Sequence, residues 1–200
     1  MALHFSKQEF KKRKLATLKS MKEQNLDALL MFRQESMFWL TGYDTFGYVF
    51  FQTLILDQKG NIILLTRAPD LRQAQNTSNI EDIRIWVDKD QSNPTDDLKI
   101  ILNELNLKGK KIGIEYEAYG MTGRNALRLN KSLEGYCKVE DQSELITKHR
   151  VIKSQEEIVY VKRAAELADQ ALDEAWNYAK AGASEAKILA EMQRVVLEGG

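Results

Sequence analysis

The sequence predicts an α/β domain with a mixed sheet flanked by helices, followed by two helices of an incomplete second domain. Over roughly the first 140 residues, strand-like and helix-like segments alternate, and one pair of strand-like segments is joined by a short polar turn. After Ser154, apolar residues recur every three or four positions, which is helical spacing. We therefore expect an N-terminal α/β domain over 1–145, with a linker and helices over 146–200.

The first elements are predicted by their boundary residues. Ser6 and Glu9 have the spacing of a capping box, so a helix should begin there and continue to about Gln24. A short buried strand over 28–32 precedes a short helix, which Gly42 closes.

The alternation then continues through the domain. The expected segments are strands 48–56 and 62–66 joined by the turn DQKGN, helix 69–75, strand 83–87, helix 95–105, strand 110–116, helix 122–133 and strand 136–141. Because a hairpin is combined with strands separated by helices, the sheet should be mixed and covered on both faces.

Two helices should follow, because Ser154 and Glu157 form a second capping box and Gly182 separates the helices. The apolar stripe of the first helix comprises Ile158, Val161, Ala165, Ala168, Leu172, Ala175 and Ala179. Small residues in such a stripe favour close packing against another element. With no sheet of their own, these helices are expected to begin a second domain.

Composition excludes several classes of function. Lysine plus arginine equals aspartate plus glutamate, 29 of each, whereas nucleic-acid or membrane-surface binding requires a basic excess. No apolar run approaches the ~20 residues of a membrane span, so we expect a cytoplasmic protein. Cys137 is the single cysteine, and His4 and His149 are isolated, so no metal site is expected in this chain. His149 lies among cations and is expected to face solvent.

The stretch FWLTGYDTFGYVFF, residues 38–51, contains seven aromatic rings. These rings form either a core strand or the wall of a ligand site. Strand alternation would bury part of the stretch, but it cannot hide Tyr43, Phe46 and Tyr48. We expect a bend at Gly47 that projects rings toward a ligand or a partner subunit.

Arg67 ends a predicted strand, and Asp70 follows in the first turn of the next helix. An arginine in this position can bind a carboxylate through two parallel hydrogen bonds. It can equally form a structural ion pair with Asp70. The residues alone leave both interpretations open.

The order of these pieces resembles the creatinase/prolidase family. The segments DALL, LTGY and IGIEYEAYG resemble its N-terminal domain, and RVIKSQEEI resembles the family junction R-x-I-K-S-x-x-E-I that precedes the first helix of the catalytic domain. The resemblance implies a hydrolase with a pita-bread catalytic domain, in which two Asp, one His and two Glu hold divalent metal ions (Mn, Zn, Co or Fe). Such enzymes cleave a C–N bond in an Xaa-Pro dipeptide or in a small amide or amidine of the creatine or ectoine type.

The resemblance also implies a homodimer, in which the N-terminal domain of one subunit closes over the active site of the other. Creatinase-like members carry an F-G-Arg segment there; Phe46 and Gly47 match it, whereas Tyr48 replaces the arginine, which argues against creatine. Arg67 and Asp70 resemble the ectoine-hydrolase pattern. The resemblance therefore makes Phe46, Tyr48, Arg67 and Asp70 substrate-binding candidates.

No catalytic or metal-ligating residue of the family is matched before Gly200, so the chain by itself is expected to be inactive, as a fragment or a natural truncation. Its expected contribution is substrate capping and dimerisation. One alternative is a non-catalytic peptide- or ligand-binding module of the same architecture. Another is a stand-alone α/β ligand-binding module with a dimerising helical tail.

Overall fold

The computed structural model describes residues 3–199. The chain forms two compact units, Met1–Ile152 and Lys153–Gly200. The first unit continues to residue 152, beyond the boundary expected near residue 145, and includes a further short helix.

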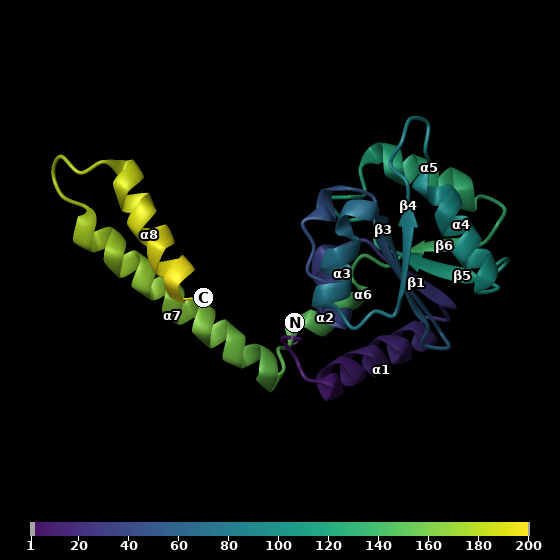
Figure 1. The fold of residues 1–200 in the computed structure, drawn as a ribbon. Coiled ribbons are helices and arrows are strands. Elements are labelled where there is room, and N and C mark those ends of the chain that lie inside the picture. The colour runs from purple at the N-terminus through teal and green to yellow at the C-terminus, as the bar shows by residue number, and fades with distance from the viewer. Residues whose placement is uncertain (1–2, 200) are drawn as a thin grey trace. The chain divides into compact units, whose positions relative to one another are not determined.

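The first unit alternates helices and strands, as expected (Figure 1). Its elements are α1 (Lys7–Glu23), β1 (Ala28–Met31), α2 (Gln34–Thr41), the 3-10 helix η1 (Gly47–Val49), β2 (Thr53–Asp57), β3 (Ile62–Arg67), the 3-10 helix η2 (Ala68–Asp70), α3 (Leu71–Thr77), β4 (Asp82–Trp86), α4 (Pro94–Glu104), β5 (Lys111–Ile114), α5 (Gly123–Leu133), β6 (Lys138–Asp141) and α6 (Leu145–Val151). The second unit contains α7 (Gln155–Tyr178) and α8 (Glu185–Gly199).

The six strands form one mixed sheet in the order β4-β3-β2-β1-β5-β6. β2 is antiparallel to both of its neighbours, β1 and β3, while the pairs β3–β4, β1–β5 and β5–β6 are parallel. The carboxyl ends of β1, β3, β4, β5 and β6 therefore lie at the same edge of the sheet. The expected mixed sheet is confirmed.

A hydrophobic core lies on each face of the sheet. Leu30 belongs to the core that α4 and α5 cover, whereas Leu29 and Met31 belong to the core covered by α1, α2, α3 and α6. This division follows from the alternation of side chains along a strand. Because every residue of β1 and β2 is buried, the sheet is covered on both faces, as expected for a largely parallel sheet.

The predicted helix caps are present. Ser6 Oγ accepts a hydrogen bond from the Glu9 amide, at 3.1 Å, at the start of α1. Gly42 adopts φ 82° directly after α2, and its amide donates to the carbonyl of Phe38. A left-handed backbone at this point favours glycine, so the helix ends where the sequence predicted.

The predicted strand over 48–56 is wrong in its first half. β2 begins only at Thr53, and the aromatic residues before it form a loop that contains η1. The expectation that the sheet cannot hide Tyr43 is also wrong, because Tyr43 is fully buried. Two further differences are that β6 begins at Lys138, after a turn at Gly135 with φ 66°, and that α6 was not predicted.

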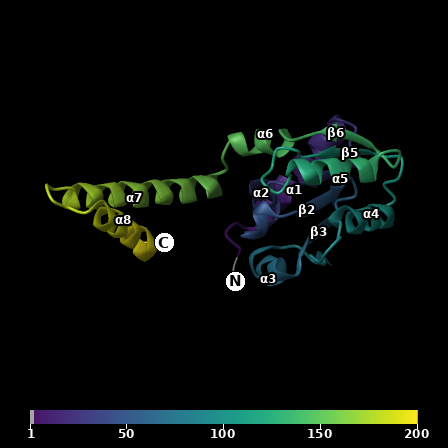
Figure 2. The ribbon, with the colours of Figure 1, turned by 90° about the horizontal axis from the view of Figure 1, so that it is seen from above.

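The second unit is a helical hairpin, in which α7 and α8 lie side by side (Figures 1 and 2). Ser154 and Glu157 form the predicted capping box at the start of α7. Among the described residues of this unit only Ala171 is buried, and Val161 and Leu172 of the predicted stripe are about half exposed (52% and 53%). These two stripe residues are therefore not covered by α8.

No helix within residues 3–199 combines the length and the apolar character that crossing a bilayer requires.

Candidate functional site

The aromatic bend, defined here as residues 43–52, connects the end of α2 to the start of β2. A buried polar network supports it from below. Tyr43 Oη donates to Gln52 Oε1 at 2.9 Å, Thr66 Oγ1 donates to the same oxygen at 3.2 Å, and Gln52 Nε2 donates to Thr45 Oγ1 at 3.3 Å. Because Tyr43 and Gln52 lie at the two ends of the bend, their hydrogen bond closes the loop.

The burial that makes this network possible raises the pKa of Tyr43, which therefore remains a neutral hydrogen-bond donor. Satisfied polar groups in a buried network favour one defined arrangement. The bend is consequently a supported loop whose backbone course is fixed from inside the domain.

Gly47 is required for the close approach of the bend to Asp70. A Cβ atom built on Gly47 would lie 2.6 Å from each carboxylate oxygen of Asp70, which is well inside contact distance. The backbone of Gly47 does not need a left-handed conformation, so the requirement here is for space. Gly47 thus allows η1 to pack directly on the buried Asp70 carboxylate.

Arg67 is positioned by two contacts. Its Nε donates to Asp70 Oδ2 at 3.1 Å, and its guanidinium carbon lies 3.4 Å from the centroid of the Phe50 ring. Only 13% of the Arg67 side chain is exposed. Among residues 3–199, neither Nη group of Arg67 makes a hydrogen bond. The structural ion pair with Asp70 is present, and it still leaves the Nη edge of the guanidinium for another acceptor.

The rings of the bend differ in their exposure. Phe46 is 86% exposed, and Phe50 is 44% exposed. Tyr48 is half-buried, because it packs edge-to-face on Tyr119 at a centroid distance of 5.6 Å. The bend therefore presents Phe46 to its surroundings, while Tyr48 belongs to a second cluster of rings.

The loops after the neighbouring strands hold the outside of the bend. A Cβ on Gly120 would lie 2.3 Å from the carbonyl oxygen of Phe50, so the loop after β5 packs tightly on the bend. Trp86 Nε1 at the end of β4 donates to the carbonyl of Phe51 at 3.0 Å. The structure brings Arg67, Asp70 and Gly47 into one cluster and places Tyr48 beside Tyr119.

A buried carboxyl group that the sequence analysis did not assign to the site lies nearby. Glu115 directly follows β5 and is fully buried. Its Oε2 accepts from the amides of Phe32 and Arg33, both at 3.0 Å, and its Oε1 accepts from Ser36 Oγ at 2.6 Å. Glu115 therefore caps the beginning of α2 from a neighbouring strand.

Burial raises the pKa of Glu115 to about 7, although the hydrogen bonds from Ser36 and the two amides and the nearby Arg33 guanidinium act in the opposite direction. The sequence signal that could have identified it is the glutamate of IGIEYEAYG, which ends an otherwise apolar strand.

His149 is half-buried rather than facing solvent, so that prediction is wrong. Its ring stacks on Trp39 at 5.8 Å, and its Nε2 lies 3.0 Å from Ser20 Oγ. These contacts join α6 to α1 and α2. The basic residues on either side of His149 along the chain gave no indication of them. Burial lowers the pKa of His149.

The residues described supply no group of three or more His, Cys, Asp or Glu side chains that could hold a metal ion. The divalent ions that the family resemblance implies therefore do not fit this part of the protein.

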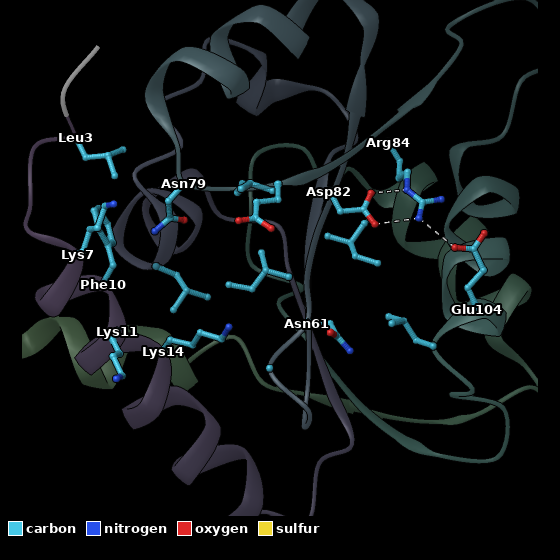
Figure 3. A pocket seen from close by; sticks show the side chains of 17 residues that line it. Leu3, Lys7, Phe10, Lys11, Lys14, Asn61, Asn79, Asp82, Arg84 and Glu104 are labelled. Atoms are coloured by element: carbon cyan, nitrogen blue, oxygen red, sulfur yellow. Dashed lines mark hydrogen bonds and ion pairs between the residues drawn. The ribbon is translucent and has the colours of Figure 1, made fainter.

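A cavity of about 830 Å³ lies at the opposite end of the strands from the bend, where β3 and β4 begin (Figure 3). Lys7, Lys11 and Lys14 of α1 line one side. On the other side Arg84 forms ion pairs with Asp82 and Glu104. None of Phe46, Tyr48, Arg67 and Asp70 lines this cavity, so it is separate from the predicted site.

Comparison with known proteins identifies the fold and its relatives. Residues 13–152 match the creatinase/prolidase N-terminal domain. The chain is 26% identical to the uncharacterized hydrolase/peptidase y4tM of Sinorhizobium fredii (98% of this chain, 52% of the relative) and 24% identical to the ectoine hydrolase of Halomonas elongata (100% and 51%).

Among solved structures, the X-Pro aminopeptidase of Thermotoga maritima superimposes with a TM-score of 0.76 at 21% identity, covering 94% of this chain and 49% of that one. The chain thus spans about half the length of these curated relatives. Since the domain match extends over most of the first unit and the sheet has the expected mixed topology, the chain belongs to the creatinase/prolidase N-terminal domain family.

Proposed function

We propose that this chain is the substrate-capping and dimerisation part of a metal-dependent hydrolase that cleaves a C–N bond. The substrate class is an Xaa-Pro dipeptide or a small amide or amidine of the ectoine type. Relatives named as a hydrolase/peptidase and an ectoine hydrolase support this class. The observation that carries the proposal is the aromatic bend, because a ring that is 86% exposed stands on a loop whose backbone is fixed from below.

An exposed aromatic ring on a supported loop is suited to contact with another surface. In a homodimer, Phe46 and Tyr48 would enter the active site of the other subunit and limit the space around the substrate. Excluding water in this way strengthens the electrostatic interactions within a site.

Arg67 would bind a negatively charged group of the substrate through its Nη edge. The Asp70 carboxylate holds Nε at 3.1 Å, and Phe50 lies against the guanidinium plane, so the side chain is already oriented before a substrate arrives. Such orientation lowers the entropic cost of binding. Asp70 is therefore assigned the role of positioning Arg67, which unites the two interpretations of this pair.

The divalent metal ions belong, in this proposal, to other residues of the complete enzyme. The described residues supply no ligand group. We accordingly expect the 200-residue chain by itself to show no hydrolase activity and to retain no stoichiometric transition metal after dialysis.

The proposal is tested in the complete enzyme by measuring kcat and KM for Arg67→Ala and Phe46→Ala. Loss of the carboxylate contact should cost ~2–4 kcal/mol in kcat/KM, as for truncated charge-assisted pairs at interfaces. Val49→Ala serves as the matched control, because Val49 is also exposed on the bend. Unchanged kinetics for both test variants, or losses that follow from unfolding alone, would reject the proposed roles.

A mixed-dimer experiment tests whether the bend acts across the subunit interface. An Arg67→Ala subunit, whose homodimer is expected to lose ~2–4 kcal/mol in kcat/KM, is combined with a subunit whose metal ligands have been removed and whose homodimer is expected to be inactive. If the bend serves the other subunit, one active site of the mixed dimer is complete and activity returns. No recovery in a verified mixed dimer argues against action across the interface. Inactivity of the unaltered complete protein with all four metals would favour the non-catalytic module instead.

A further inference from the structure

A crevice lies where the chain leaves two neighbouring parallel strands in opposite directions. After β1 the chain continues into α2, which packs on the face of the sheet that contains Leu29. After β5 it continues toward α5, which packs on the face that contains Leu30. In open α/β sheets, ligands bind outside the carboxyl ends of the strands at such a switch point.

The structure has a cavity of about 520 Å³ at this point. Residues 32–35 line it from the end of β1, and residues 116–119 line it from the end of β5; Tyr48 of the bend and Arg150 of α6 complete it. Its volume is in the range typical of small-molecule sites, roughly 300–1,000 Å³.

Aromatic rings form the walls of the crevice. Tyr48 and Tyr119 meet edge-to-face, so together they make one continuous apolar surface. Tyr116 is half-buried, and its hydroxyl donates to Asn130 Oδ1. Phe32 is buried beneath, with 1% of its surface exposed. The accessible faces of the tyrosine rings can bind either apolar groups or cations.

The charged groups in the crevice divide into a satisfied pair and two unsatisfied groups. Arg33 forms an ion pair with Glu117 and donates to Thr147 Oγ1 at 2.6 Å. Arg150 and Glu35 are both half-buried and also line the crevice. Neither side chain makes a hydrogen bond or an ion pair with any residue of the part that the structure describes. One positive and one negative group thus remain for a ligand.

We propose that this crevice binds a small zwitterion of about dipeptide size. The ligand carboxylate would pair with Arg150, and its ammonium group would pair with Glu35 and face the tyrosine rings. Apolar side chains of the ligand would lie against Tyr48 and Tyr119. The site lies wholly within the first unit and carries its own charged groups, so it is additional to the active site of the proposed hydrolase and shares only the Tyr48 ring with the proposed capping surface.

The test is a titration of the 200-residue chain, labelled with ¹⁵N, with the dipeptide Phe-Pro. Saturable shifts should appear at amides 32–35, 48, 116–119 and 150, with a Kd of about 1 mM or tighter. Two modified ligands test the zwitterion. N-acetyl-Phe-Pro lacks the ammonium group, and Phe-Pro amide lacks the carboxylate. Each should bind about tenfold more weakly, since tenfold in Kd corresponds to ~1.4 kcal/mol.

Variants link each charge to its partner. Arg150→Gln should weaken Phe-Pro about tenfold but leave the affinity for Phe-Pro amide nearly unchanged, and Glu35→Gln should show the same relation with N-acetyl-Phe-Pro. The matched controls are Lys11→Gln and Glu81→Gln, which alter the separate cavity at the other end of the strands and should leave binding unchanged.

Absence of saturable shifts, shifts centred on the other cavity, or equal affinity for the dipeptide and both modified forms would overturn the inference. These outcomes are measured by binding alone, so they are distinct from failure of the proposed hydrolase function, which is measured by kinetics in the complete enzyme.

Discussion

Replacing Glu115 by glutamine should remove one contribution to the pH dependence of the free energy of unfolding, namely the titration of the buried carboxyl group that caps α2. Glu115 is fully buried and accepts three hydrogen bonds, from the amides of Phe32 and Arg33 and from Ser36 Oγ. Glutamine can keep all three contacts. Its carbonyl oxygen can accept from the two amides, and its Nε2 can donate to Ser36 Oγ. The substitution therefore removes the charge while preserving the connections.

The sign of the effect follows from the direction of the pKa shift. Burial raises the pKa of Glu115 from 4.5 to about 7. Below pH 4.5 the carboxyl group is protonated in both the folded and the unfolded chain. Between these two pKa values the unfolded chain loses the proton and the folded chain retains it. The stability contributed by this group is thus fully present below pH 4.5 and is lost as pH rises toward 7.

The magnitude follows from the same interval. Each pH unit corresponds to about 1.4 kcal/mol, so native stability should fall by ~3 kcal/mol between pH 4.5 and pH 7 through this group. Glu115→Gln is uncharged throughout. Relative to the native chain, the variant should therefore gain ~3 kcal/mol in free energy of unfolding at pH 8 compared with pH 4.5.

Urea unfolding of both chains between pH 4.5 and pH 8 measures this difference, with tryptophan fluorescence as the signal. Trp39 and Trp86 lie in the first unit, whereas Trp176 lies in the second, so a Trp176→Phe background restricts the signal to the first unit. His149, whose pKa is lowered, contributes a slope of the opposite sign, but it is present in both chains and cancels in the difference.

A difference between the two chains that changes with pH in the other direction would refute the raised pKa of Glu115. A variant that loses stability relative to the native chain as pH rises would show that the three hydrogen bonds stabilise the carboxylate more than burial destabilises it. A titration of the Glu115 carboxyl carbon by ¹³C NMR then locates the pKa directly.

Three further substitutions test the site. Gly47→Ala should destabilise the first unit by ~1–3 kcal/mol in urea unfolding, because the new Cβ would lie 2.6 Å from the Asp70 carboxylate. The control is Gly123→Ala, which should not destabilise because no atom lies within 4 Å of its new Cβ. Equal losses of stability in the two variants would disprove the close packing at Gly47. Tyr43→Phe should cost ~1–3 kcal/mol by leaving a buried amide oxygen with one donor fewer, and no loss would mean that the network is dispensable. Burial lowers the pKa of the native histidine, so protonation of His149 should destabilise the fold as pH falls below 6.5. His149→Gln should therefore lose less free energy of unfolding than the native chain over this pH range. An unchanged dependence on pH would show that His149 does not contribute to it.

The architecture could be predicted because local signals and the sheet agree. The capping serines, Gly42 after α2 and the apolar strand segments are each readable within a few residues of sequence. The helix α6 was missed because it is short and because only Leu145 and Ile146 bury apolar surface, which is too little for a periodic pattern.

The bend was misjudged for a different reason. Aromatic and β-branched residues favour strands, and residues 48–52 are rich in them. The contacts that override this preference come from other elements. Asp70 follows β3, and Thr66 belongs to β3. No local pattern contains the position of the Asp70 carboxylate under Gly47, so the loop and the burial of Tyr43 become visible only in the folded structure.

The crevice could not be predicted for a related reason. Glu115 and the Phe32 amide that it accepts from are 83 positions apart in the sequence, and they meet because β1 and β5 pair in parallel. Because β1 also pairs with β2, which follows the bend, the two pairings together bring Tyr119 beside Tyr48. A sequence pattern can predict that each strand exists, but the partner of each strand is decided by the whole sheet.

The bend and the crevice share the loop that follows β5. Gly120 packs against the carbonyl of Phe50, and Tyr119 of the same loop packs on Tyr48, so the loop after β5 both backs the bend and lines the crevice. Arg67 contacts only the bend side, through Phe50 and Asp70, whereas Arg150 lines only the crevice. Tyr48 belongs to both sides, but each side has an arginine of its own. Capping of a second subunit and binding of a zwitterion therefore use different cations of the same domain, and either arginine can be replaced without altering the other.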